Sequence, residues 1–311
     1  MLGVYKKVSV SEEFDTSEGA LPFSLQHIAE KELGETPSRR KDAIQKLLQI
    51  LSDEPEFNSK KDDAFLLRFL RVRKYNVDAA MQTIRNYYKI RTACGPIYCD
   101  FLPSKVPSAA RKLCMVMPEK DVHGRPILFM NIGQWIPSEL PFSEYQKAWT
   151  ICLEHMASDP VTQVLGVALL LDYNGFSIDK MLSVSLGLLK KAWEYVQDCM
   201  PMRLKAIHVL NQSYTFDVLY TLVRPIMKTK LAERFQLYGE SYDRLHEEIP
   251  SSVLPEEYGG QGPPLDYEAF WRRVDAEEEL FAANNQFGYT RPTGEDDFPT
   301  DEEILEELTF M

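Results

Sequence analysis

Apolar residues recur every three or four positions in the first third of the chain, which is the period of an amphipathic helix. The pattern predicts a helix over residues 39–51, a second helix that opens at Asp62, and a third that begins after Asn76. Short links join them, so we expect a small helical bundle within an N-terminal domain of residues 23–100. Residues 1–22 are polar and lack periodicity, and we expect a flexible leader there.

Beyond residue 101 the pattern changes to short apolar runs separated by helical stretches. The runs predict strands at residues 126–131, 164–171, 206–210 and 234–238. Helices are expected between them at residues 142–157, 178–199 and 215–233. The second and third runs are continuously apolar, as in strands that are covered on both faces. Strands that alternate with long helices predict an α/β domain over residues 101–262, followed by a C-terminal extension at 263–311.

Charge is distributed unevenly along the chain, which carries 47 acidic and 35 basic residues and a net charge of −12. Residues 265–311 hold 14 acidic and 3 basic residues, so an acidic tail accounts for nearly the whole excess. Residues 38–91, in contrast, hold 13 basic and 7 acidic residues. We therefore expect no nucleic-acid partner, whereas a local basic patch for an anionic lipid headgroup fits the distribution.

Several features of the sequence bear on where in the cell the protein is located. The longest stretch without an Asp, Glu, Lys or Arg covers residues 126–138, which is too short to cross a bilayer. The N-terminus has no apolar segment of signal-peptide length, and Gly3 is out of place for myristoylation. The five cysteines lack CxxC spacing, which suits reduced thiols. We therefore expect a cytoplasmic protein.

Motifs of catalysis are missing, since the chain has no HExxH, GxSxG, P-loop or GxGxxG pattern. The glycines of residues 259–262 precede two prolines instead of a helix, so we interpret them as a turn that closes the domain. Glu154 with His155, and Asp121 with His123, pair a carboxylate with an imidazole but have no third partner at ligand spacing. We predict no catalytic residue, no metal site and no cofactor.

The segment of residues 215–227 is apolar on nearly every side. Such a helix is usually buried in a core, but it can also cover an apolar cavity on one face and meet lipid on the other. The pattern by itself favours burial.

Four basic residues flank the later elements. Arg203 and Lys205 lie two apart at the entrance to an apolar strand, and Lys230 and Arg234 lie four apart on a predicted helix, so each pair shares a face. The spacing alone favours scattered, solvated charges over a site.

Five segments together resemble the CRAL-TRIO lipid-transfer family. They follow the order and spacing of that family at residues 62–80, 121–133, 166–177, 200–211 and 254–262. The resemblance covers residues 39–262 and is greatest to the branch that contains the tocopherol and retinaldehyde carriers. It implies an α/β fold in which an N-terminal helical bundle precedes a lipid-binding cage with a mobile lid helix at residues 215–230. The lid interpretation therefore replaces burial for this segment.

The resemblance also implies a carrier without a chemical step. Its cargo would be one hydrophobic lipid, such as a retinoid, a tocopherol, another isoprenoid or phosphatidylinositol. Apolar pattern and family position together suggest a pocket wall of Phe129, Trp149, Leu153, Leu169, Leu171, Leu182, Leu186, Leu189, Phe216, Leu219, Leu222, Val223 and Ile226. Trp149 and Leu153 stand where the tocopherol carrier has small hydroxyl residues, and the loop after Gly175 is shorter, so tocopherol is a less suitable cargo than shape-matched or differently anchored lipids.

Family position further implies a basic cleft that binds phosphoinositide headgroups and brings the carrier transiently to membranes. Its residues in this chain would be Arg68, Arg203, Lys205, Lys230 and Arg234.

An alternative is a lipid-sensing or phosphoinositide-sensing adaptor that signals through a protein partner. Its main support is the acidic tail, where Ile304, Leu305 and Leu308 form an amphipathic turn among carboxylates. The tail could dock on a partner or compete with lipid headgroups for the basic cleft. A purely solvated tail fits its composition equally well.

Overall fold

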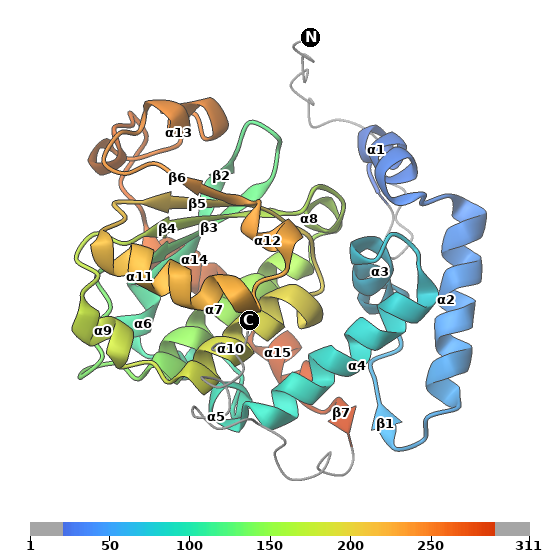
Figure 1. Cartoon of the computed structure of the whole chain (residues 1–311). Coiled ribbons are helices and arrows are strands. Elements are labelled where there is room, and N and C mark those ends of the chain that lie inside the picture. Colours follow the sequence, from blue (N-terminus) through green and yellow to red (C-terminus); the bar gives the residue numbers. More distant parts are fainter. Residues whose placement is uncertain (1–20, 290–311) are drawn as a thin grey trace.

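The structure is a computed structural model that describes residues 21–289 (Figure 1). The predicted leader up to residue 20 and the amphipathic turn of Ile304, Leu305 and Leu308 lie outside the described residues.

The described N-terminal region contains the helices α1 (Phe23–Leu33), α2 (Pro37–Ser52), α3 (Asp63–Val72) and α4 (Val77–Ala93). The last three were predicted, and a polar side chain caps the start of each one. The side chains of Thr36, Asp62 and Asn76 accept hydrogen bonds from backbone N–H groups three residues later, at 3.2, 2.9 and 3.0 Å. Helix α1 has no side-chain cap at its start, so the sequence lacked the signal that marks a helix N-terminus.

Five strands form the central sheet in the order β2 (Cys114–Lys120), β3 (Pro126–Asn131), β4 (Val167–Asp172), β5 (Leu204–Leu210) and β6 (Phe235–Leu237). β2 runs antiparallel to β3, and the remaining neighbours are parallel. The predicted strands correspond to β3–β6, whereas β2 was missed because its second half is polar and exposed. The predicted α/β class with a preceding helical region is confirmed.

Helices cover the sheet and connect its strands (Figure 1). They are α7 (Phe142–Ala157), α8 (Pro160–Leu165), α9 (Ile178–Leu182), α10 (Leu186–Glu194), α11 (Tyr214–Val223) and α12 (Thr229–Ala232). The predicted helix at 178–199 is in fact α9, α10 and a π-helical turn at Tyr195–Cys199, with a break before Leu186. The predicted helix at 215–233 is interrupted by a 3-10 turn at Arg224–Ile226, where Pro225 cannot donate a backbone hydrogen bond.

Short elements complete the described chain: β1 (Phe57–Asn58), α5 (Gly95–Tyr98), η1 (Pro103–Lys105), α6 (Ser108–Arg111), α13 (Asp243–Glu248), η4 (Glu256–Tyr258), α14 (Tyr267–Asp275), α15 (Glu278–Asn284) and β7 (Gly288–Tyr289). Gly259 and Gly260 follow η4 in the predicted turn. Gly259 has a φ of 69°, and a Cβ atom on Gly260 would lie 1.8 Å from the carbonyl oxygen of Leu254, so this turn requires glycine.

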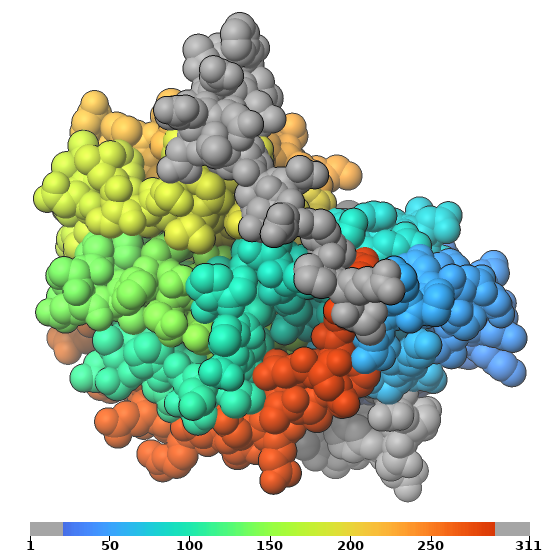
Figure 2. All heavy atoms as spheres, turned by 90° about the horizontal axis from the view of Figure 1, so that it is seen from below, coloured from blue at the N-terminus to red at the C-terminus, as the bar shows by residue number. Residues whose placement is uncertain are grey.

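The C-terminal extension joins the two larger regions instead of hanging free. The indole N–H of Trp271 in α14 donates to the carbonyl oxygens of Arg111 and Cys114, at 2.9 and 3.1 Å. β7 pairs antiparallel with β1, with Tyr289 opposite Phe57. Figure 2 shows this orange-red segment beside both the blue N-terminal helices and the green part of the sheet domain.

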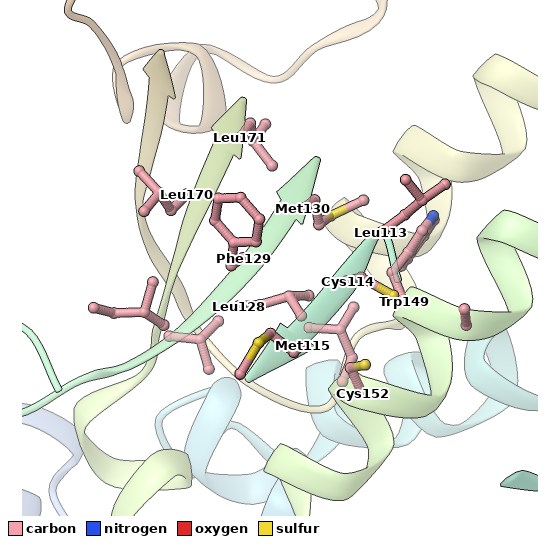
Figure 3. Close-up of a cluster of buried hydrophobic side chains, with 14 of the residues drawn as sticks. Leu113, Cys114, Met115, Leu128, Phe129, Met130, Trp149, Cys152, Leu170 and Leu171 are labelled. Atoms are coloured by element: carbon pink, nitrogen blue, oxygen red, sulfur yellow. The ribbon is translucent and has the colours of Figure 1, made fainter. Parts of the chain in front are cut away.

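The two faces of the sheet bury different side chains because successive residues of a strand point to opposite sides. In Figure 3, Phe129 and Leu170 lie on one side of their strands, and Met130 and Leu171 lie on the other, toward Trp149 of α7. The first side is closed by the segment around Leu245, Leu254 and Tyr258, all buried. The second side faces α7, α10 and α11 and contains an apolar cavity.

Candidate ligand cavity and basic cluster

An almost entirely apolar cavity of about 160 Å³ lies between the sheet and the helices α7, α10 and α11. Alternate residues of two strands form its floor: Leu128, Met130, Leu169 and Leu171. Alternate residues do so because successive side chains of a strand point to opposite faces of the sheet. A cavity of this chemistry favours an apolar occupant over water.

Six of the thirteen predicted pocket residues lie on the wall of this cavity: Trp149, Leu153, Leu169, Leu171, Leu189 and Leu219. They come from α7, β4, α10 and α11, so the structure brings together segments that are 70 residues apart in the chain.

Phe129 was assigned to the wrong side of the sheet. It is fully buried on the opposite face, with its ring centroid 5.6 Å from that of Tyr258. An uninterrupted apolar run such as that of β3 does not reveal which alternate residues face the cavity, because both faces are apolar.

Leu182 was also misplaced, since it is 73% exposed at the end of α9. The break between α9 and α10 shifts the helical phase on which its assignment rested. Leu186 and Leu222 are half-buried and do not reach the wall.

The remaining three predicted residues pack beside the cavity without lining it. Phe216 is 2% exposed, and its ring centroid lies 4.7 Å from that of Tyr173. Val223 and Ile226 belong to a small separate cluster with Met227.

Sequence reasoning missed all six of the other aromatic residues on the wall: Trp135, Phe142, Tyr145, Tyr173, Phe176 and Trp193. Most of them lie in loops or at helix ends, where periodicity carries no information. Tyr173 is the exception, because it extends the alternation of Leu169 and Leu171 by one further step beyond the end of β4.

The segment predicted as a lid lies beside the cavity but is only partly buried. In α11, Phe216 and Val223 are buried, whereas Val218, Leu219, Tyr220 and Leu222 are half-buried. Tyr214 of α11 is 80% exposed, and Ile178 and Leu182 of the contacting helix α9 are exposed as well. We call Ile178, Leu182 and Tyr214 the apolar rim.

Three of the predicted basic residues are neighbours. Arg203 and Lys205 both pair with Glu32 of α1, at 3.1 and 3.5 Å. Burial, followed by the positive charge of Arg203, lowers the pKa of Arg234. Burial and the same charge also lower the pKa of Lys205. Arg203, Lys205 and Arg234 thus form one basic cluster with Glu32 as its anion.

Glu32 responds to this cluster in the opposite sense. Partial burial opposes its ionisation, but the charge of Lys205 and the contact with Arg203 outweigh burial and lower the pKa of Glu32. The carboxylate is therefore held ionised between the two cations.

Arg68 does not belong to the basic cluster. It is 9% exposed and lies 3.6 Å from Glu154, which also forms an ion pair with Arg91 at 2.9 Å. These contacts connect α3 and α4 to α7, which gives Arg68 a structural partner inside the protein. A basic residue in a helical signature does not show which face of the helix it occupies, and the headgroup contact of Arg68 stays a prediction.

Lys230 lies exposed in α12 and has no ion-pair partner among residues 21–289. Because α12 ends at Ala232, Arg234 follows the helix and leads into β6. The four-residue spacing therefore does not place Lys230 and Arg234 on one helical face.

Within the described part of the chain, no group of three His, Cys, Asp or Glu residues could hold a metal ion. No helix there is long and apolar enough to span a membrane. His155 forms a hydrogen bond to Glu277 through Nδ1 at 2.9 Å, and His123 lies 3.4 Å from Glu248.

Comparisons with known proteins agree with this geometry. A family model described as the CRAL/TRIO domain matches residues 110–260, and one described as a Pinta-like UBA domain matches residues 36–105. The alpha-tocopherol transfer protein-like protein of Homo sapiens is 36% identical over 261 residues, which cover 83% of this chain and 75% of that one. Clavesin-1 of Rattus norvegicus is 32% identical over 251 residues, covering 79% and 70%.

The chain therefore belongs to the CRAL-TRIO family, as its sequence segments indicated. Among solved structures, the crystal structure of Sfh5 aligns with a TM-score of 0.51 at 13% identity and covers 96% of this chain and 99% of that one. At this identity the likeness concerns the fold alone.

Proposed function

We propose that the chain is an intracellular carrier that binds one hydrophobic lipid in its cavity and transfers it between membranes. The observation that carries this proposal is the apolar cavity between the sheet and α7, α10 and α11. Membership of the CRAL-TRIO family and relatives named as tocopherol-transfer-like proteins support it. No catalytic step is part of the proposal.

Apolar burial supplies the binding energy. At about 25 cal/mol per Å², burial of an isoprenoid-sized surface is worth on the order of 10 kcal/mol before association costs. Lipid held in this way leaves slowly in water, so release requires an opening that is favourable only at a membrane.

The lid proposal concerns α11 and the turn that follows it. The cavity of about 160 Å³ is smaller than the roughly 300–1,000 Å³ of most ligand pockets, so a complete lipid requires its walls to move outward. Helix α11 has two buried side chains and α10 has none, against twelve in α7, so the walls formed by α10 and α11 move outward more easily than α7. At a membrane, the apolar rim would exchange water for lipid as α11 opens.

The basic cluster supports a second part of the proposal, a phosphoinositide headgroup as the membrane contact. Each charge-assisted hydrogen bond to a phosphate contributes about 1.5–3 kcal/mol, so three cations can dock a carrier without holding it permanently. Glu32 forms ion pairs with Arg203 and Lys205, and a headgroup would have to replace its carboxylate there. The protein would then be cytoplasmic and only transiently associated with membranes.

Native mass spectrometry of the purified chain, followed by organic extraction, tests the carrier function. One stoichiometric lipid is expected. Ala192→Trp fills the cavity wall and should remove the bound lipid, whereas Ala283→Trp on the exposed face of α15 should not. A chain that stays empty when offered retinoids, tocopherols and phosphoinositides would overturn the proposal.

The adaptor is the second candidate, and the match of residues 36–105 to a UBA-type domain favours it. In that case cargo or phosphoinositide would change a surface that binds a protein partner through the acidic tail. Deletion of residues 291–311 separates the two functions. Unchanged transfer with loss of a partner supports the adaptor, and faster transfer supports competition between the tail and the headgroup.

A further inference from the structure

The cavity wall contains polar groups that have no partner. Apart from its apolar side chains, the wall includes Trp135, Tyr145, Trp149, Tyr173 and Trp193. The indole N–H of Trp135 donates to the carbonyl oxygen of Leu140 at 2.8 Å. The hydroxyl of Tyr145 and the indole N–H of Trp193 are buried without a hydrogen-bond partner among residues 21–289, and no hydrogen bond contributes to the pKa of the Tyr173 phenol.

The groups of Tyr145, Tyr173 and Trp193 are all hydrogen-bond donors. An indole N–H can only donate a hydrogen bond, and a phenol donates readily. Buried donors in proteins are nearly always paired, because an unpaired one loses its hydrogen bonds to water without replacement. No side-chain carbonyl or carboxylate oxygen lines the cavity among the described residues, so an oxygen atom of an occupant would supply an acceptor that these side chains do not.

Tyr173 is the best placed of the three. It is 8% exposed, and it follows Leu169 and Leu171 at the same period of two, which directs its ring to the cavity face of the sheet. Phe216 and Phe176 hold the ring in edge-to-face contacts with centroid distances of 4.7 and 5.2 Å. Its orientation is therefore fixed by packing and not by a hydrogen bond of its own.

The electrostatics of Tyr173 point the same way. Burial alone raises the pKa of its phenol, without a neighbouring charge or hydrogen bond as a further cause. The group is therefore neutral at physiological pH and retains its proton for donation.

We propose that the hydroxyl of Tyr173 donates a hydrogen bond to an oxygen atom of the cargo, so that the chain selects lipids with a hydroxyl or carbonyl group over hydrocarbons of the same shape. This inference rests on the proposed carrier function. Because Phe216 of α11 packs on Tyr173, the oxygen-bearing end of the lipid would lie next to the lid segment.

The test compares two ligands that differ by one oxygen, all-trans-retinol and its deoxy analogue axerophthene. Trp135, Trp149 and Trp193 line the cavity, so energy transfer from tryptophan to the bound polyene reports binding of both ligands. Tyr173→Phe should weaken retinol binding by about three- to tenfold, as expected for loss of one neutral hydrogen bond. Axerophthene binding should change by less than about twofold.

Tyr267→Phe is the matched control, because it removes a hydroxyl from a partly buried tyrosine of α14 that does not line the cavity, and it should leave both affinities unchanged. Tyr173→Phe should not lower the melting temperature, since the lost hydroxyl has no partner in the protein. Equal changes for the two ligands, or none, would overturn the role of Tyr173 while leaving the carrier function intact. If the wild-type chain binds neither ligand, a retinoid-type cargo and this inference both fail.

Discussion

Helices α3 and α10 are both amphipathic, yet the protein uses them in opposite ways. Every residue from Phe65 to Arg71 in α3 is buried, whereas no residue of α10 is buried. α3 packs against α2, α4 and α8, and α10 stands over the cavity. The difference shows that an apolar helix face predicts that the face is buried. It does not predict whether protein or a ligand buries it. Protein covers α3, and we propose that lipid completes the cover of α10.

The largest effect on the stability of the protein is expected when a buried leucine of α3 is shortened. Leu66 of α3 is fully buried, so Leu66→Ala removes packing and leaves a cavity. We expect the free energy of unfolding to fall by about 2–5 kcal/mol, measured by urea denaturation. A loss below about 1 kcal/mol would mean that the helical region is less tightly packed than its burial indicates.

Lowering the pH should destabilise the protein through a histidine on the closed face of the sheet. His208 of β5 is fully buried opposite Leu170, and its Nδ1 forms a hydrogen bond with the hydroxyl of Tyr238 at 2.9 Å. Burial lowers the pKa of His208 to about 4. The unfolded chain, with an ordinary histidine pKa near 6.5, therefore binds more protons between these values, and stability falls as the pH drops.

The expected loss from this histidine between pH 7 and pH 5 is about 2 kcal/mol. His208→Gln should flatten the pH dependence of the melting temperature in this range. His27→Gln, which replaces an exposed histidine of α1, should leave that dependence unchanged. Identical pH profiles for His208→Gln and wild type would show that His208 is not kept neutral by burial.

Shortening a leucine on the cavity wall should have a smaller effect on stability. Leu189 of α10 is half-buried and faces the cavity, so Leu189→Ala removes few protein contacts. We expect the lipid-free chain to lose less than about 1 kcal/mol of stability. Cargo affinity should fall by a similar free energy, and calorimetric titration with retinol measures it. A stability loss as large as that of Leu66→Ala would remove the contrast between the two helices.

The contact between α1 and the start of β5 should give the smallest effect when it is removed. Glu32→Gln removes the carboxylate that pairs with Arg203 and Lys205 and leaves both cations available. Because such a half-exposed pair is worth about 0.2–1 kcal/mol, we expect binding to vesicles with phosphatidylinositol bisphosphate to increase up to about fivefold. Added salt should reduce this gain.

Glu30→Gln is the matched control, since Glu30 is exposed on the same helix and has no ion-pair partner among residues 21–289. Vesicle sedimentation compares the variants. A response of Glu30→Gln equal to that of Glu32→Gln would indicate a general charge effect in place of a specific basic cluster.

Sequence reasoning worked where one local signal decides the outcome. Side-chain caps at Asp62 and Asn76 locate α3 and α4, and continuous apolar runs locate β4 and β5. It misplaced Phe129 and did not reveal the partner of Arg68, because the question in both cases was which neighbour the residue meets. Neither the face of a fully apolar strand nor the partner of a basic residue is encoded in local periodicity.

The sequence by itself thus determined the family, the α/β class, the helical N-terminal region and the strands β3–β6, because helix caps and hydrophobic periods act over a few residues. Only the tertiary structure decided that Tyr173 has no partner, that Arg203 and Lys205 share Glu32, and that six predicted residues enclose one cavity. These properties depend on distances between segments far apart in the chain. Such distances follow from how the layers pack, and a linear pattern of residues does not contain them.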